Sequence, residues 1–152
     1  REGAALVRAP YGASDAAIAR FAAQHQAWLE SHMARRQAYL AAHPVPSPQQ
    51  VEAWRQQAKA VLPQRVAYWA RRMDVQPAGI TITAARTRFG SCSGKNRLSF
   101  SLYLMAYPET AIEYVVVHEL AHIRHHDHSP AFYREVEAYL PDWRARRALL
   151  RR

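Results

Sequence analysis

The sequence contains only one cysteine, Cys92, and no long uninterrupted apolar run. A single cysteine excludes an intrachain disulfide, and with it the small secreted domains that depend on disulfides for stability, so we expect a cytoplasmic protein. No run approaches the roughly 20 apolar residues that span a bilayer, so we expect no membrane partner. Internal repeats and extended low-complexity tracts are also missing, which leaves an ordinary globular chain.

Acidic residues are few relative to basic ones, since 12 Asp and Glu face 21 Lys and Arg and give a net charge of +9. Much of the excess lies near the C-terminus, at Arg144, Arg146, Arg147, Arg151 and Arg152. We interpret this basic tail as the solvated face of a terminal helix, because no fold signature of a nucleic-acid-binding protein accompanies it. Nucleic acid is therefore a candidate partner that the sequence does not favour.

The length and the composition of the chain favour one folded domain. A chain of 152 residues can bury a real core, and a hydrophobic fraction of 49% with 22% charged residues is typical of globular proteins. We expect a single domain over residues 1–152, with a helical N-terminal part over about 14–73 and a catalytic part over about 78–143.

Two long helices are predicted in the first half of the chain. Apolar residues recur at helical spacing over residues 14–42 and again over 47–73, and each stretch opens at a serine that can cap a helix. The prolines within residues 43–48 end the first helix, because proline lacks an amide donor and restricts the residue before it. Pro63 predicts a kink or a break in the second helix. We expect the two helices to pack against each other and against the second half of the chain.

The character of the sequence changes to strand after residue 79. The β-branched run Ile80–Thr83 and the alternating segment Arg97–Leu104 both predict β-strands. The glycine and asparagine residues between these two segments indicate turns within a hairpin-like loop. Two further helices are predicted, one opening at Pro108 and one at Ser129, and the last helix is expected to break near Pro141.

The clearest candidate for a metal-binding catalytic motif is the segment His118-Glu-Leu-Ala-His122. Its two imidazoles are four residues apart and therefore lie on one helix face, with Glu119 beside them. This is the HExxH arrangement of zinc hydrolases, so we expect one Zn²⁺ per chain, held by His118 and His122. A third ligand is needed to complete such a site.

Candidates for the third ligand follow within twenty residues of the motif, namely His125, His126, His128, Glu135 and Glu137. On a continued helix His126 would lie about 12 Å from His118 along the axis, too far for both to bind one ion through bonds of about 2.1 Å. His128 directly precedes the expected cap Ser129, where the chain turns and can bring the side chain back. We therefore choose His128, and three histidines leave the fourth zinc position to water.

A catalytic role follows for Glu119, which can take a proton from the attacking water and return it to the leaving amine. Candidate substrate or oxyanion contacts are Arg88, Tyr103 and Tyr133. The segment Arg97–Leu104 precedes the motif helix and is a candidate for holding an extended peptide by backbone pairing.

Three stretches together resemble one known family. Arg86–Cys92, Val115–Ile123 and His128–Tyr133 are similar, in order and spacing, to the YgjP-like bacterial metallopeptidases, which are related to SprT-like and minimal zincin proteins. The resemblance implies an α+β, zincin-like fold with a small, mostly antiparallel sheet, an HExxH helix and, in this chain, long N-terminal packing helices. It also implies His128 as a zinc ligand, while Phe89 and Tyr133 stand where the family usually has tryptophan.

The resulting hypothesis is a zinc metallopeptidase that hydrolyses peptide bonds of a peptide or protein substrate. One alternative is a zinc hydrolase of non-peptide amides. Another is a DNA-associated, SprT-like protease or binding module, recruited by the basic charge. The resemblance supplies no substrate, so the choice rests on the HExxH motif and the third histidine.

Overall fold

The computed structural model of the chain describes residues 8–42 and 45–150. These residues divide into two compact units, Arg1–Pro46 and Ser47–Arg152, which are described one at a time. The expected single domain over 1–152, and the expected packing of its first long helix against the second, stay predictions.

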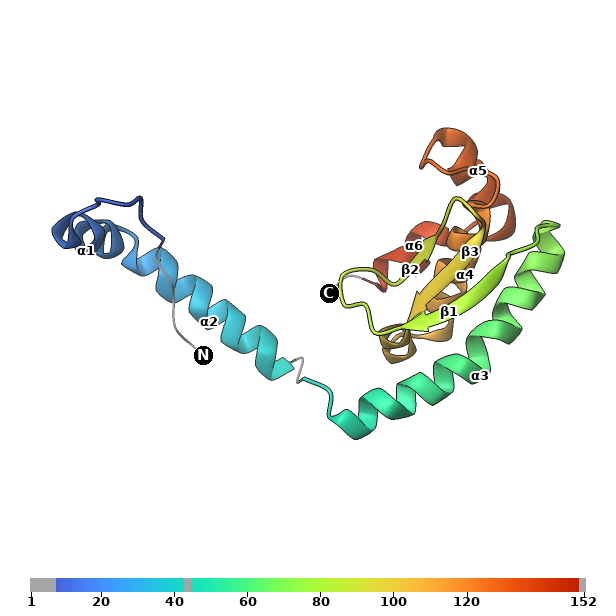
Figure 1. The fold of residues 1–152 in the computed structure, drawn as a ribbon, viewed down its shortest axis with the longest axis horizontal. Helices are drawn as coiled ribbons and strands as arrows, with labels where there is room; N and C mark the ends of the chain where they lie inside the picture. Colours follow the sequence, from blue (N-terminus) through green and yellow to red (C-terminus); the bar gives the residue numbers. More distant parts are fainter. Residues whose placement is uncertain (1–7, 43–44, 151–152) are drawn as a thin grey trace. The chain divides into compact units, whose positions relative to one another are not determined.

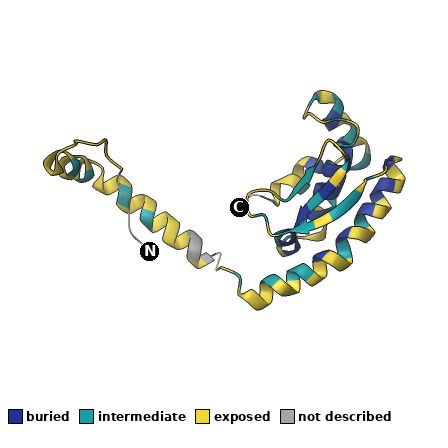
Figure 2. Ribbon diagram, viewed as in Figure 1, coloured by how far each residue is buried: buried dark blue, intermediate teal, exposed yellow. Residues whose placement is uncertain are grey.

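The first unit contains two helices, α1 (Asp15–Gln24) and α2 (Gln26–Ala42), where the sequence predicted one. Ser14 caps α1 as expected, and its hydroxyl accepts a hydrogen bond from the Ala17 amide. The prediction of a continuous helix is wrong at His25, whose backbone leaves the helical region and whose ring nitrogen lies 2.8 Å from the Phe21 carbonyl oxygen. None of the described side chains of α1 and α2 is buried, as the colouring of Figure 2 shows.

The second unit opens with α3 (Pro48–Met73), which follows the predicted cap and first-turn proline. The Ser47 hydroxyl accepts from the Gln50 amide at 3.1 Å. The helix continues through Pro63, which excludes the predicted break, and its ribbon curves along the sheet and α4 in Figure 1. One face of α3 is buried through Ala58, Leu62, Val66, Trp69, Ala70 and Met73.

A three-stranded sheet follows, formed by β1 (Gly79–Thr83), β2 (Gly90–Cys92) and β3 (Arg97–Ser101) in the order β1-β3-β2. Strand β3 pairs parallel with β1 and antiparallel with β2. The α+β class is confirmed, but the sheet is mixed rather than mostly antiparallel. The tight β2–β3 hairpin accounts for this, because it turns β3 back to run in the direction of β1.

Strand β3 is shorter than predicted and ends at Ser101. A 3-10 helix, η1 (Leu102–Ala106), replaces the expected strand from residue 102 to 104, and the Ser101 hydroxyl accepts from the Tyr103 amide at its start. Leu102 and Leu104 are both fully buried, as they would be on one face of a strand. Alternation alone therefore could not separate the two structures.

The motif helix, α4 (Glu109–Ala121), is the most buried helix of the unit, followed by α5 (Pro130–Tyr139) and α6 (Trp143–Ala148). Its residues Ile112, Val115, Val116 and Leu120 are all buried. Glu113 of α4 forms ion pairs with Arg65 of α3 and Arg146 of α6, which links three helices around one carboxylate. Within residues 8–42 and 45–150, no helix combines the length and apolar character needed to cross a membrane.

Candidate functional site

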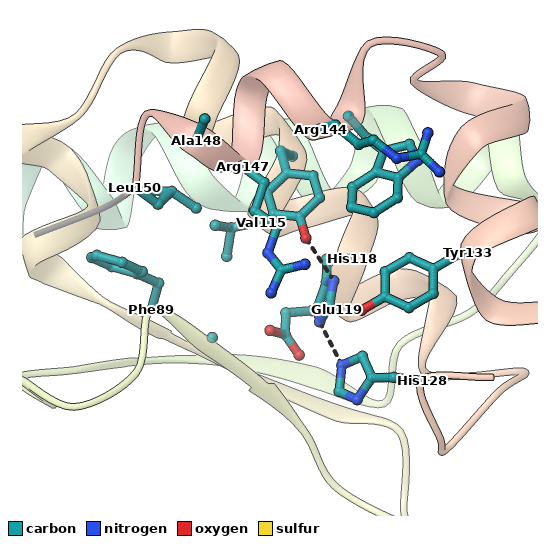
Figure 3. A pocket seen from close by; sticks show the side chains of 13 residues that line it. Phe89, Val115, His118, Glu119, His128, Tyr133, Arg144, Arg147, Ala148 and Leu150 are labelled. Carbon is teal, nitrogen blue, oxygen red and sulfur yellow. Dashed lines mark hydrogen bonds between the residues drawn. The ribbon is translucent and has the colours of Figure 1, made fainter. Parts of the chain in front are cut away.

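Three histidines converge where α4 ends and the chain turns towards α5. His118 lies in the last turn of α4, His122 is its C-cap residue, and His128 directly precedes the Ser129 cap of α5. One ring nitrogen from each lies within 4.8 Å of the others. The Nε2 atoms of His118 and His128 are 3.1 Å apart, and Figure 3 shows these two rings facing each other. The turn after α4 therefore brings the three imidazoles to one point.

The other ring nitrogens of the two helix histidines have partners in the protein. His118 Nδ1 lies 3.3 Å from the Tyr114 hydroxyl, one turn earlier on α4, and His122 Nδ1 lies 2.8 Å from the His125 carbonyl oxygen. A histidine that donates from Nδ1 carries its free lone pair on Nε2. Both rings are thus oriented to present Nε2 to a shared ligand.

Burial favours the neutral form of the two helix histidines, His118 and His122, which is the form that binds metal. It lowers the pKa of His118 to about 3, and the neighbouring His122 and His128 act in the same direction. Burial also lowers the pKa of His122. Phe132 packs against both helix histidines. Its ring centre lies 4.5 Å from that of His122 and 4.8 Å from that of His118.

Glu119 is buried beside the histidines, with only 5% of its surface exposed. Removal from water raises the pKa of its carboxyl to about 8, and the positive charge of Arg88 opposes that rise. Strand β2 passes directly over this side chain, since a Cβ built on Gly90 would lie 2.5 Å from Glu119 Oε1. Position 90 is therefore restricted to glycine by space.

A pocket of about 1030 Å³ opens onto the site. The residues that line it include His118, Glu119, His128, Tyr133, Trp143 and Arg147. Trp143 is buried and stacks on Tyr133 with ring centres 4.8 Å apart. Two of the three candidate metal ligands, His118 and His128, and the candidate base Glu119 thus face one cavity large enough for part of a peptide.

Comparison with known proteins identifies the family. The model of the YgjP-like metallopeptidase domain matches residues 46–152, which is more than half of the chain. The chain belongs to the YgjP-like family. It is therefore a metal-dependent peptidase, and the resemblance read from its sequence is confirmed.

A solved structure supports the fold of this YgjP-like chain. The metallopeptidase zymogen of Pyrococcus abyssi abylysin is 24% identical, with a TM-score of 0.50, over 56% of this chain and 85% of that one. This similarity concerns the fold alone. No curated protein matches the chain.

The residues predicted as substrate or oxyanion contacts lie at different distances from this site. Tyr133 lines the pocket, and its ring centre is 6.1 Å from that of His128. Arg88 acts on Glu119 through its charge. Tyr103 is not brought to the pocket, since its ring packs against Trp54 and beneath the guanidinium of Arg86.

The remaining candidates for the third ligand have other partners or lie elsewhere. Glu135 pairs with Arg124 at 2.8 Å and with His125 at 2.7 Å, and Glu137 pairs with Arg144. His126 is exposed and lies outside the group of converging histidines. The local geometry therefore favours His128.

Sequence reasoning missed three residues that shape the site, Tyr114, Gly90 and Arg147. Tyr114 could have been found, because it lies four residues before His118 and hence on the same helix face. Gly90 was interpreted only as a turn residue, and Arg147 only as part of a solvated tail. Their positions depend on the packing of β2 and α6 against α4, which no local pattern contains.

Proposed function

We propose that this chain is a zinc peptidase in which His118, His122 and His128 bind one zinc ion and Glu119 is the general base. The main support is the convergence of three ring nitrogens within 4.8 Å, with the Nδ1 atoms of the two helix histidines engaged elsewhere. Three imidazoles are a donor set typical of catalytic zinc and leave one position for water. The residues present therefore fit the metal.

A bound zinc ion would supply a Lewis acid and would lower the pKa of its water to about 7. The protein supplies the proton transfers. Glu119, shielded from solvent beneath β2, accepts a proton from the attacking water and delivers it to the leaving amine. Its low exposure also keeps bulk water from competing for the carboxylate.

Tyr133 is the best placed of the three predicted contacts to stabilise negative charge on the substrate carbonyl oxygen. It lines the pocket, and Figure 3 shows its hydroxyl directed towards His118 and Glu119. A hydroxyl donor aimed at the developing charge is the arrangement that lowers the barrier to acyl transfer. The positive charge of Arg88 acts on Glu119, and Tyr103 receives no role as a substrate contact.

The peptide-pairing role must be assigned to a different strand. Strand β3 lies between β1 and β2, so its backbone is already paired on both sides and the peptide-pairing role predicted for Arg97–Leu104 is wrong. Strand β2 is an edge strand and passes over Glu119 at Gly90. We therefore propose β2 as the strand that pairs with an extended substrate.

The family favours peptide or protein substrates over non-peptide amides. No observation on the described residues favours the DNA-associated alternative, and ion pairs of Arg144 and Arg146 with Glu137 and Glu113 use part of the basic charge on α6. Zinc as the metal and a cytoplasmic location stay predictions.

Metal content tests the proposal directly. Wild type, His128→Ala, Glu119→Gln and the control His126→Ala are purified identically without added metal and analysed by mass spectrometry. We expect about one zinc per chain in all but His128→Ala, because His126 lies outside the converging group. Of the zinc-loaded proteins, Glu119→Gln should show no peptide cleavage. Full zinc in His128→Ala would refute the ligand assignment, and no metal in wild type would refute the zinc site.

A further inference from the structure

The three described arginines of α6 differ in what they contact. Arg144 pairs with Glu137 at 2.9 Å and lies over the Trp143 ring. Arg146 pairs with Glu113 at 2.9 Å and with Asp142 at 2.8 Å. Arg147 has no carboxylate at ion-pair distance among residues 8–42 and 45–150. Within the described part of the chain, it is therefore the α6 arginine whose charge no carboxylate offsets.

Arg147 lies in the pocket that contains the metal-site residues. Figure 3 shows its side chain directed into this pocket, on the side of His118 and Glu119. A cationic group that no described carboxylate pairs with thus borders the space where a substrate would lie.

The helix that carries Arg147 is held in place by its neighbours. Arg146 shares Glu113 with Arg65 of α3, and Trp143 is buried against Tyr133. These contacts fix α6 on the motif helix, so the base of the Arg147 side chain is rigidly positioned. A recognition group attached to a fixed element loses less freedom on binding.

We propose that Arg147 determines specificity by binding a carboxylate of the substrate. This inference rests on the proposed function, because it places the substrate in the pocket beside the zinc site. A guanidinium offers paired N–H donors that match the two oxygens of a carboxylate. The net charge of +9 also favours anionic over cationic peptides. The carboxylate is either an Asp or Glu side chain or the C-terminal carboxylate of a short peptide.

Binding measurements test this without requiring turnover. The probes are four rhodamine-labelled alanine hexapeptides, with a central Glu or Gln and with a free or an amidated C-terminus. Their affinities are measured by fluorescence anisotropy on the full chain carrying Glu119→Gln, both zinc-loaded and metal-free. Arg147→Ala and Arg147→Glu are then added to this background. Arg134→Ala is the matched control, since Arg134 is an exposed arginine of α5 outside the pocket.

We expect peptides with one added carboxylate to bind about tenfold more tightly than their uncharged counterparts, the scale of one charge-assisted contact. Arg147→Ala should abolish the difference, Arg147→Glu should reverse it, and Arg134→Ala should preserve it. A preference for Glu identifies a side-chain carboxylate, and a preference for the free terminus identifies the C-terminal one.

Two results overturn the inference. One is that the chain with Arg147 intact binds the charged and uncharged peptides equally well. The other is that a preference for the charged peptides survives Arg147→Ala. Failure of the proposed function is recognised separately, by a chain that binds no zinc or that cleaves no peptide when loaded. The metal-free arm still reports on Arg147 in that case.

Discussion

Helices α2 and α3 show how similar sequence patterns lead to different structural roles. Each carries tryptophan, leucine and alanine at helical spacing, and the same reasoning predicted a packed amphipathic helix for both. In α3 the pattern becomes a buried stripe, with Leu62 fully buried, whereas Trp28 of α2 keeps 57% of its surface exposed. Apolar spacing thus predicts that a helix forms, and a partner surface decides whether it contributes to a core.

The partner surface of α3 is formed by β1, η1 and the motif helix α4. The family match begins at residue 46, close to where α3 starts, and leaves out α1 and α2. Stability should therefore depend strongly on α3 and weakly on α1 and α2.

The largest expected effect comes from truncating matched apolar residues in the two regions. Leu62→Ala should lower the free energy of unfolding by about 2–5 kcal/mol, because it leaves a cavity in a packed core. Trp28→Ala should change it by less than about 0.5 kcal/mol, because the side chain is exposed. Urea unfolding followed by circular dichroism measures both, and equal losses would contradict the comparison.

A pH effect of up to about 4 kcal/mol should arise from the buried carboxyl of Glu119 in the metal-free protein. Its folded pKa of about 8 lies above the ordinary value of 4.5, so the folded state holds a proton that the unfolded state has released. The contribution of Glu119 to stability is therefore fully present below pH 4.5 and is lost as the pH rises towards 8. Glu119→Gln should abolish this loss.

The measurement is urea unfolding of both proteins in chelator between pH 5 and pH 8. A segment of residues 47–152 should show the same difference between glutamate and glutamine, because Gly90 and the α4 residues around Glu119 all belong to it. Parallel pH profiles of wild type and variant would show that Glu119 titrates normally.

The smallest effect concerns the serines that cap α1 and α3. Ser47→Ala should cost about 1 kcal/mol in the main unfolding transition, because it removes an acceptor for the Gln50 amide of a helix that packs on the core. Ser14→Ala should leave that transition unchanged and slightly reduce the helix content, which the circular dichroism signal at low urea reports. A shift of the main transition by Ser14→Ala would show that the two regions unfold together.

Local patterns were sufficient for most of the helices, whereas the fold class was implied by the family resemblance. The caps at Ser14, Ser47 and Ser129 each form the expected hydrogen bond, because a short polar side chain satisfies amides only a few residues away. The predicted element bounds are wrong where a side-chain hydrogen bond, rather than the apolar spacing, decides the local structure. At Ser101 a local side-chain cap starts a 3-10 helix, and at His25 a side chain competes for a helical carbonyl.

The sequence by itself determined that two imidazoles and a carboxylate share one end of a helix, since helical geometry follows from spacing alone. It also suggested that His128 returns to them, because a turn and a cap follow the motif. Only the tertiary structure decided which strand covers Glu119 and that Arg147 faces the same pocket. Those two facts depend on contacts between residues about thirty positions apart or more, and such contacts form only when separate elements pack.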